Sequence, residues 1–228
     1  MTAPARVGIV GGTFDPIHVG HLAAASAAQE ALALGEVRFI PSNRPPHRPG
    51  GPLASGAERL EMTALAVAGR PGWSASDLEL RRDGPSYTFD TLQALHADGL
   101  RPEQIFFVIG ADAFADIRKW SRFPAVLDAA HFVVIERHGT PIERLVERLP
   151  DLTARVSTPA QLIAEAGTRI VLIAADTPDV SATQVRERAS RGEDLSDLVP
   201  PPVAAFIGSR GLYRTSGGSR STAVASGR

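Results

Sequence analysis

Short apolar runs alternate along this chain with longer segments of helical spacing, and this alternation is the feature that most limits its fold. The apolar runs have the length of buried strands and lie at residues 7–10, 37–41, 105–109, 132–135 and 170–174. The segments of helical spacing lie between them, at residues 22–34, 57–68, 88–95 and 142–149. Strand–helix alternation predicts an α/β fold, doubly wound, with a mostly parallel sheet and helices on both faces.

In such a sheet the ligand crevice lies at the carboxyl ends of the strands, so a site must be built from the turns that follow them. The longest of these turns is the segment 41–56, whose five prolines and two adjacent glycines exclude a helix or a central strand. Long loops in compact domains are typically functional or disordered, and this one carries Arg44, His47 and Arg48. A solvated surface loop is the alternative interpretation.

Composition supports a single globular domain and excludes several kinds of chemistry. Of 228 residues 43% are hydrophobic, and neither a repeat nor a linker interrupts them, so we expect one domain over residues 1–214 and a disordered polar tail over 215–228. The 24 basic and 25 acidic residues give a net charge of -1, which predicts no general attraction to nucleic acid or to a membrane. The absence of cysteine excludes disulfides, thiol nucleophiles and thiolate metal sites. Without a signal peptide or a long apolar segment, we expect a cytoplasmic protein.

The first apolar run leads directly into the segment Gly11 to His21, which we call the first cradle. Its glycines allow backbone N–H groups to approach an anion, and a helix beginning at about Ile17 or Val19 would add its N-terminal donors. His18 and His21 are three residues apart, so on such a helix both imidazoles lie on one face. Hydrogen bonds to a charged group contribute about 1.5–3 kcal/mol each, against about 0.3–1 kcal/mol for the helix dipole. The histidines therefore dominate the binding of a phosphate.

A bound triphosphate would favour the charged form of both imidazoles, which titrate near about 6.5 when free. We expect both rings to be protonated in the nucleotide complex. Activity is then expected to fall on the alkaline side.

A second candidate cradle follows the last apolar run. Ser181, Thr183 and Arg186 would stand at the start of a helix, with Ser181 as its N-cap. After a strand, these residues would place two hydroxyls and an arginine at the carboxyl edge of the sheet. The alternative is a simple helix cap with a solvated Arg186.

The first cradle resembles the signature of the HxGH nucleotidyltransferase superfamily, in Gly12-Thr13-Phe14-Asp15-Pro16 and His18-Val19-Gly20-His21. The second resembles the Ile-Ser-Ser-Thr-x-x-Arg motif of the same superfamily, with Val180 and Ala182 as departures. The resemblance implies in-line attack of an acceptor phosphate on the α-phosphorus of ATP, without a covalent intermediate, and Mg²⁺ held mainly through the ATP phosphates with no protein ligand. It implies an ATP site formed by Gly11, Gly12, Thr13, Phe14, His18, His21, Ser181, Thr183 and Arg186, of which His18, His21 and Arg186 are catalytic.

Further segments resemble the nicotinate-mononucleotide adenylyltransferases of that superfamily, a family with a Rossmann-like fold that makes deamido-NAD for NAD biosynthesis. These segments are residues 41–48, residues 86–92, Gly110-Ala111-Asp112 with Trp120, and Gly211-Leu212-Tyr213. The resemblance implies that Gly110 and Asp112 bind the ATP ribose. It implies that nicotinate mononucleotide is bound by Arg44, His47, Thr88, Trp120 and Arg137. For Trp120 the alternative is core packing, and for Arg137 an ordinary surface arginine.

Three other functions compete with this interpretation. Phosphopantetheine adenylyltransferases share the first cradle but lack the segments around Pro45-Pro46-His47 and Ser86-Tyr87-Thr88. A nucleotide-sensing module would have no need of both histidines. A metallohydrolase using His18, His21 and Asp15 would require a further His/Asp cluster, which the sequence does not space suitably. The sequence leaves open whether the chain forms a homo-oligomer.

Overall fold

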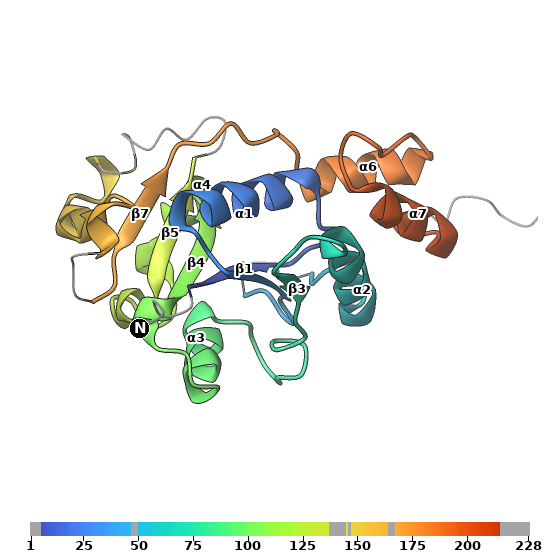
Figure 1. Ribbon diagram of the computed structural model, residues 1–228. Coiled ribbons are helices and arrows are strands. Elements are labelled where there is room, and N and C mark those ends of the chain that lie inside the picture. Colours follow the sequence, from blue (N-terminus) through green and yellow to red (C-terminus); the bar gives the residue numbers. More distant parts are fainter. Residues whose placement is uncertain (1–5, 47–49, 137–144, 146, 164–166, 215–228) are drawn as a thin grey trace, which may run out of the picture.

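The computed structural model describes residues 6–46, 50–136, 145, 147–163 and 167–214. Within these residues one sheet of seven parallel strands runs in the order β3-β2-β1-β4-β5-β7-β6 (Figure 1). The strands are β1 Val7–Gly12, β2 Glu36–Pro41, β3 Trp73–Ala75, β4 Ile105–Gly110, β5 His131–Ile135, β6 Val156–Ser157 and β7 Ile170–Ile173. All five predicted strands are confirmed, while β3 and β6, three and two residues long, were not predicted.

Three of the four predicted helices are confirmed as α1, α2 and α3. The helices are α1 Val19–Leu32, α2 Gly56–Val67, α3 Thr88–Ala97, α4 Ala111–Phe114, α6 Ala182–Arg191 and α7 Pro201–Arg210. Short 3₁₀ turns lie at Pro102–Gln104, Ile117–Lys119, Ala125–Asp128, Pro150–Arg155 and Gln161–Ile163. Half of the fourth predicted helix, 142–149, lies outside the described residues, as does the whole tail 215–228, while residues 145, 147 and 148 are helical. None of the helices in the described ranges has the length and apolar character needed to span a bilayer.

Apolar side chains cover both faces of the sheet, which is why its central strands read as continuous apolar runs. In β4, Phe106 and Val108 join a core cluster with α1, α2, α6 and α7, while Ile105 and Phe107 join a second cluster with α3. The alternation follows from the two-residue period of a strand. Figure 1 shows α1 and α3 on opposite sides of the sheet. The doubly wound α/β fold is therefore confirmed.

The order of the strands places a crevice between β1 and β4. From β1 the chain adds β2 and then β3 on one side, and returns to add β4 and β5 on the other. Connections leave the carboxyl ends of β1 and β4 in opposite directions, which opens the sheet edge to a ligand at this point. The first cradle follows β1 and α4 follows β4, so both walls of this crevice come from turns after strands.

Side-chain caps set where the helices begin. Ser55 accepts a hydrogen bond from the backbone N–H of Glu58, whose carboxylate accepts in return from the Ser55 N–H, so α2 starts at Gly56. Ser181 accepts from the backbone N–H of Gln184, which confirms it as the N-cap of α6.

A buried histidine at the start of β5 makes the fold sensitive to acid. Nδ1 of His131 accepts the Arg169 backbone N–H at 3.0 Å, and its ring stacks on Phe106 with centroids 4.7 Å apart. Burial lowers the pKa of His131 from 6.5 to about 4. Between these values the unfolded chain binds a proton that the folded chain does not. Stability is therefore expected to fall as pH falls through this window, by up to about 1.4 kcal/mol per pH unit.

His131→Asn tests this dependence, because its side-chain oxygen can accept the Arg169 N–H but takes up no proton. We expect the variant to lose stability from poorer packing at every pH, but to lose less than the wild type between pH 7 and pH 5. Urea unfolding at the two pH values measures the difference. An equal loss in both proteins would assign the acid sensitivity to other groups.

Candidate active site

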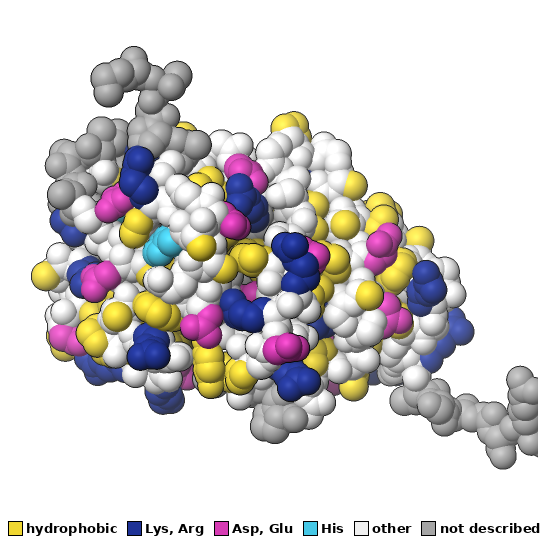
Figure 2. All heavy atoms as spheres, turned by 90° about the horizontal axis from the view of Figure 1, so that it is seen from below, with side chains coloured by type: hydrophobic (Ala, Val, Ile, Leu, Met, Phe, Trp, Pro, Cys, Tyr) yellow, Lys and Arg dark blue, Asp and Glu magenta, His cyan; other side chains and the backbone are white. Residues whose placement is uncertain are grey.

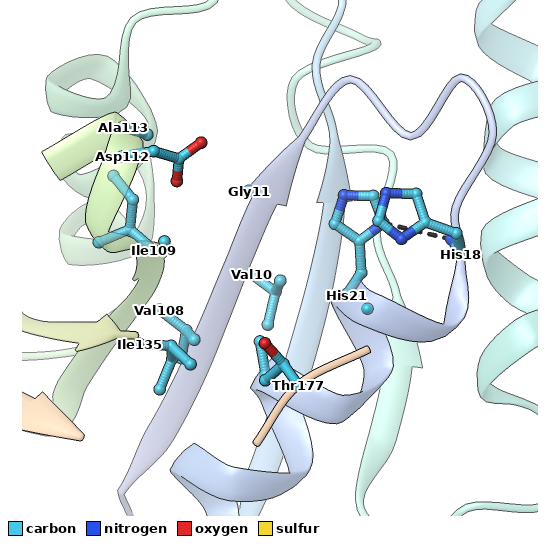
Figure 3. A pocket seen from close by; sticks show the side chains of 13 residues that line it. Val10, Gly11, His18, His21, Val108, Ile109, Asp112, Ala113, Ile135 and Thr177 are labelled. Carbon is cyan, nitrogen blue, oxygen red and sulfur yellow. Dashed lines mark hydrogen bonds between the residues drawn. The ribbon is translucent and has the colours of Figure 1, made fainter. Parts of the chain in front are cut away.

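A pocket of about 690 Å³, its open mouth included, lies in the crevice between β1 and β4 (Figure 3). Five residues predicted for the ATP site line it: Gly11, His18, His21, Gly110 and Asp112. Its floor is apolar and comes from Val10, Val108, Ile109 and Ile135 at the ends of β1, β4 and β5. The structure thus brings together residues of the first cradle and of the turn after β4, as the sheet topology requires.

His18 and His21 stack against each other at one side of this pocket. Their ring centroids are 3.6 Å apart and the ring planes differ by 28°. His18 precedes the first residue of α1, and its backbone N–H donates to Nδ1 of His21 at 3.2 Å, the bond dashed in Figure 3. The spacing of three residues therefore places both rings on one side of the helix start, as predicted.

This hydrogen bond also determines the tautomer of neutral His21. Because Nδ1 accepts the His18 N–H, the ring proton of neutral His21 lies on Nε2, so Nε2–H is the donor of this ring. A doubly protonated His21 could not accept this bond. For His21, the hydrogen bond from the His18 N–H thus conflicts with the predicted protonation of the ring in the nucleotide complex. For His18, protonation in that complex remains a prediction.

Two glycines of the first cradle serve close packing within the protein. A Cβ on Gly20 would lie 3.1 Å from Nδ1 of His18 and 3.2 Å from the Pro178 carbonyl oxygen. A Cβ on Gly12 would lie 2.7 Å from the Phe14 ring. Gly20 therefore allows the His18 ring and the Pro178 carbonyl to approach the start of α1 closely, and it also lines the pocket.

Phe14 lies beneath the histidines. Its side chain is 1% exposed, its φ of 47° is in the left-handed region, and its ring meets that of His21 edge-on at 5.0 Å. The whole residue is thus buried and its ring supports His21, while the predicted contact of Phe14 with ATP stays a prediction. Thr13 is half-buried and lies outside the residues that line the pocket.

The second cradle is joined directly to the first. One Nη of Arg186 donates to the backbone carbonyl of Asp15 at 2.7 Å, and the other donates to Thr183 Oγ1 at 2.9 Å. Arg186 is half-buried, so the alternative of a solvated arginine is wrong. Ser181, exposed at the N-cap of α6, stands at the same edge of the sheet.

The opposite wall carries Gly110 and Asp112. Gly110 ends β4, and Asp112 lies in the first turn of α4 with its side chain exposed. Figure 3 shows the Asp112 carboxylate across the end of β1 from the two imidazoles. A carboxylate in this place can accept hydrogen bonds from ribose hydroxyls.

A second pocket, of about 440 Å³, is lined by two of the five residues predicted for the acceptor. Thr88 at the start of α3 and Trp120 line it together with Pro46, Ser86, Tyr87, Lys119 and Ser121. The Trp120 indole also packs edge-on against Phe107 and Phe132, at 6.3 and 6.4 Å, so the alternative of core packing describes one side of this ring. Arg44 is exposed nearby, and its backbone N–H donates to Ser86 Oγ at 3.3 Å. His47 and Arg137 lie outside the described residues.

A buried arginine that we did not predict lies beside the first cradle. Arg59 of α2 is 1% exposed and donates to the carbonyl oxygens of Thr13 at 2.6 Å, Ser42 at 2.7 Å and Ala54 at 3.3 Å. It therefore ties the first cradle to both ends of the loop between β2 and α2. The sequence does contain a signal for it, because Arg59 falls on the same helical face as the buried residues Met62 and Ala66.

Glu79 is a second residue that sequence reasoning missed. It is buried, its Oε1 accepts the Thr91 hydroxyl at 2.6 Å, and burial raises its pKa. The neighbouring Ser86 hydroxyl oxygen accepts the backbone N–H groups of Asn43 and Arg44. Glu79 therefore lies next to Ser86, which lines the acceptor pocket. No local sequence pattern identifies Glu79 as a buried residue.

The charges of the molecule are mixed over the surface that Figure 2 shows. Lys and Arg side chains alternate there with Asp and Glu, which agrees with the net charge of -1. Among the described residues, no group of three or more His, Asp or Glu side chains is arranged to hold a metal ion.

Comparisons with known proteins identify the family of this chain. The chain matches the Cytidylyltransferase-like family over residues 9–188, a range that includes both cradles. It is 42% identical over 212 residues to the probable nicotinate-nucleotide adenylyltransferase of Pseudomonas entomophila, covering 92% of this chain and 96% of that one. The protein of the same name from Pseudomonas syringae is 39% identical over 213 residues, covering 93% and 96%. The solved structure of Plasmodium falciparum nicotinic acid mononucleotide adenylyltransferase complexed with APC shares the fold, with a TM-score of 0.69 at 18% identity over 92% of this chain and 97% of that one.

Proposed function

The chain belongs to the cytidylyltransferase-like family, among its nicotinate-nucleotide adenylyltransferases, and we propose that it transfers the adenylyl group of ATP to nicotinate mononucleotide, giving deamido-NAD and pyrophosphate. It is thus a nucleotidyltransferase of NAD biosynthesis. The observation that carries the proposal is the stacked pair His18 and His21 at the carboxyl edge of a doubly wound sheet, in a cradle whose Asp15 carbonyl binds Arg186.

The reaction requires a phosphate oxygen of the acceptor to attack the α-phosphorus of ATP while the bond to the bridging oxygen of the β-phosphate breaks. Negative charge then develops on the phosphate oxygens and on departing pyrophosphate. In our proposal, Nε2–H of His21, the His18 ring and the Arg186 guanidinium donate to these oxygens. Donors fixed in advance cost no reorganisation during the reaction, so positioning and charge neutralisation supply the catalysis.

Mg²⁺ is part of the proposal as a partner of ATP. Mg²⁺ binds mainly through substrate phosphates and keeps several waters, so in our proposal it needs no cluster of protein ligands. Its charge would neutralise part of the triphosphate. The residues of this chain would act on the remaining charge, and Asp112 with Gly110 would hold the ribose.

For the acceptor, we propose that Thr88 and Trp120 hold the pyridine ring and its carboxylate, with Arg44, His47 and Arg137 on the mononucleotide side. Support comes from the pocket that Thr88 and Trp120 share, since one face of a half-buried indole is free to stack on a flat ring. The cytoplasmic setting and a homo-oligomeric state stay predictions.

The test is a comparison of acceptors. The purified chain is incubated with Mg²⁺, ATP and either nicotinate mononucleotide, nicotinamide mononucleotide or phosphopantetheine, and pyrophosphate release is measured. We expect turnover with nicotinate mononucleotide, and a kcat/KM about 10- to 100-fold higher for the acid than for the amide, since a hydrogen bond to a charged group contributes about 1.5–3 kcal/mol.

The other outcomes separate the alternatives. Equal kcat/KM for acid and amide would contradict the proposed selectivity. Pyrophosphate release with phosphopantetheine alone would indicate a phosphopantetheine adenylyltransferase. ATP binding without turnover of any acceptor would indicate a nucleotide-sensing module.

A further inference from the structure

The carboxylate of Asp15, in the first cradle, is buried and gathers donors from two distant segments. The side chain is 1% exposed. Oδ2 accepts the backbone N–H of Leu53 at 2.9 Å, and Oδ1 accepts that of Ala54 at 3.0 Å. Oδ1 also accepts the hydroxyl of Tyr213 at 3.0 Å, across 198 positions of sequence. One carboxylate thus joins the start of the site, the segment before α2 and the C-terminal end of the described chain.

The backbone of the same residue has a separate task. The carbonyl oxygen of Asp15 accepts the Arg186 guanidinium, as described above. A change that acts on the Asp15 side chain therefore acts first on Leu53 and Ala54, and only indirectly on Arg186. Because the side chain and the carbonyl of Asp15 bind different partners, an experiment can separate an effect on Leu53 and Ala54 from an effect on Arg186.

Tyr213 is held firmly enough to orient a carboxylate. It follows α7, whose end is closed at Gly211 with φ of 61°, and the Leu212 N–H donates to the Ile207 carbonyl at 3.0 Å. Tyr213 itself has φ of 63°, a conformation that persists in a non-glycine residue only when its surroundings enforce it. Burial and the neighbouring Asp15 raise the pKa of Tyr213, so its hydroxyl remains protonated and can donate at every working pH.

We propose that Tyr213 is a positioning residue: its hydroxyl holds the Asp15 carboxylate, which in turn fixes Leu53 and Ala54 beside the first cradle. The loop that ends at these residues begins at Ser42 and includes Arg44, assigned above to the acceptor. Arg59 fixes the two ends of this loop by donating to the Ser42 and Ala54 carbonyl oxygens. Tyr213 fixes the second end through its hydrogen bond to Asp15. The C-terminal turn of the domain thereby acts on the acceptor side of the site without touching a substrate.

Tyr213→Phe removes one hydroxyl and keeps the ring. We expect faster hydrogen exchange at the Leu53 and Ala54 amides, by about tenfold, the factor that corresponds to one hydrogen bond to a charged group. Under the proposed function we also expect a 3- to 10-fold rise in KM for nicotinate mononucleotide, with KM for ATP changed less than twofold. Ser209→Ala is the matched control, because its hydroxyl lies on α7 and donates only to the Phe206 carbonyl. It should change none of these values.

Asp15→Ala provides a second test through the same path, because it removes the oxygens that accept from Tyr213, Leu53 and Ala54. If Tyr213 acts through Asp15, adding Tyr213→Phe to Asp15→Ala should not speed exchange at Leu53 and Ala54 further. Unchanged exchange in Tyr213→Phe, additive effects in the double variant, or equal rises in both KM values would overturn the proposal. Hydrogen exchange at Leu53 and Ala54 is measured without substrate, so it tests the positioning role independently of the reaction. A wild-type chain that fails to use nicotinate mononucleotide would refute only the proposed function.

Discussion

His18→Ala and His21→Ala are each expected to lower kcat by about 10²- to 10³-fold, while KM for nicotinate mononucleotide changes only a few-fold. The rings stack at one side of the pocket between β1 and β4, and the donor of the His21 ring is its Nε2–H. A donor that meets charge developing on phosphate oxygens contributes more in the transition state than in the substrate complex. Steady-state kinetics with both substrates varied measures the two parameters.

His21→Asn separates chemistry from local structure. The asparagine oxygen can accept the His18 backbone N–H in place of Nδ1, so the start of α1 should be retained, but no donor remains where Nε2–H stood. We expect kcat as low as in His21→Ala, with a thermal stability closer to the wild type. A loss confined to KM in these variants would show that the histidines only bind substrate.

Much of the fold could be predicted because the central strands are buried on both faces. β4 and β5 contribute to both core clusters, so their apolar runs are visible in the sequence without knowledge of their partners. The edge strand β3 pairs with β2 alone, and its three residues are half-buried, so it leaves no such run. The start of α1 at Val19 agrees with the start expected at about Ile17 or Val19, although the apolar spacing by itself is recognisable only from residue 22.

The site was predictable where local spacing determines it. His18 and His21 share one helical turn, so their pairing follows from the sequence, and Ser181 is a recognisable N-cap. The role of Gly20 was not predictable, because its close neighbour, Pro178, comes from the far end of the chain. For the same reason Tyr213 shows no local signal, since its partner Asp15 is 198 positions away.

Arg186→Lys is expected to lower kcat by about 10²-fold despite keeping the charge. The guanidinium donates to the Asp15 carbonyl and to Thr183 Oγ1 through two different nitrogens, which fixes its plane at the junction of the two cradles. A lysine offers one ammonium, which cannot make both bonds and still face a phosphate. Loss of one fixed donor to a transition-state oxyanion costs about 2.7–4 kcal/mol, which corresponds to this decrease.

Arg188→Lys is the matched control, since Arg188 lies on the same helix and pairs with the exposed carboxylate of Asp197. Exposed ion pairs contribute about 0–1 kcal/mol, so kcat should change less than twofold in this variant. In Arg186→Ala, added guanidinium at millimolar concentration should restore part of kcat if the missing group acts on the reacting phosphates. An Arg186→Lys enzyme with wild-type kcat would instead mean that Arg186 only links the two cradles, and that the developing charge is met by the histidines and the metal.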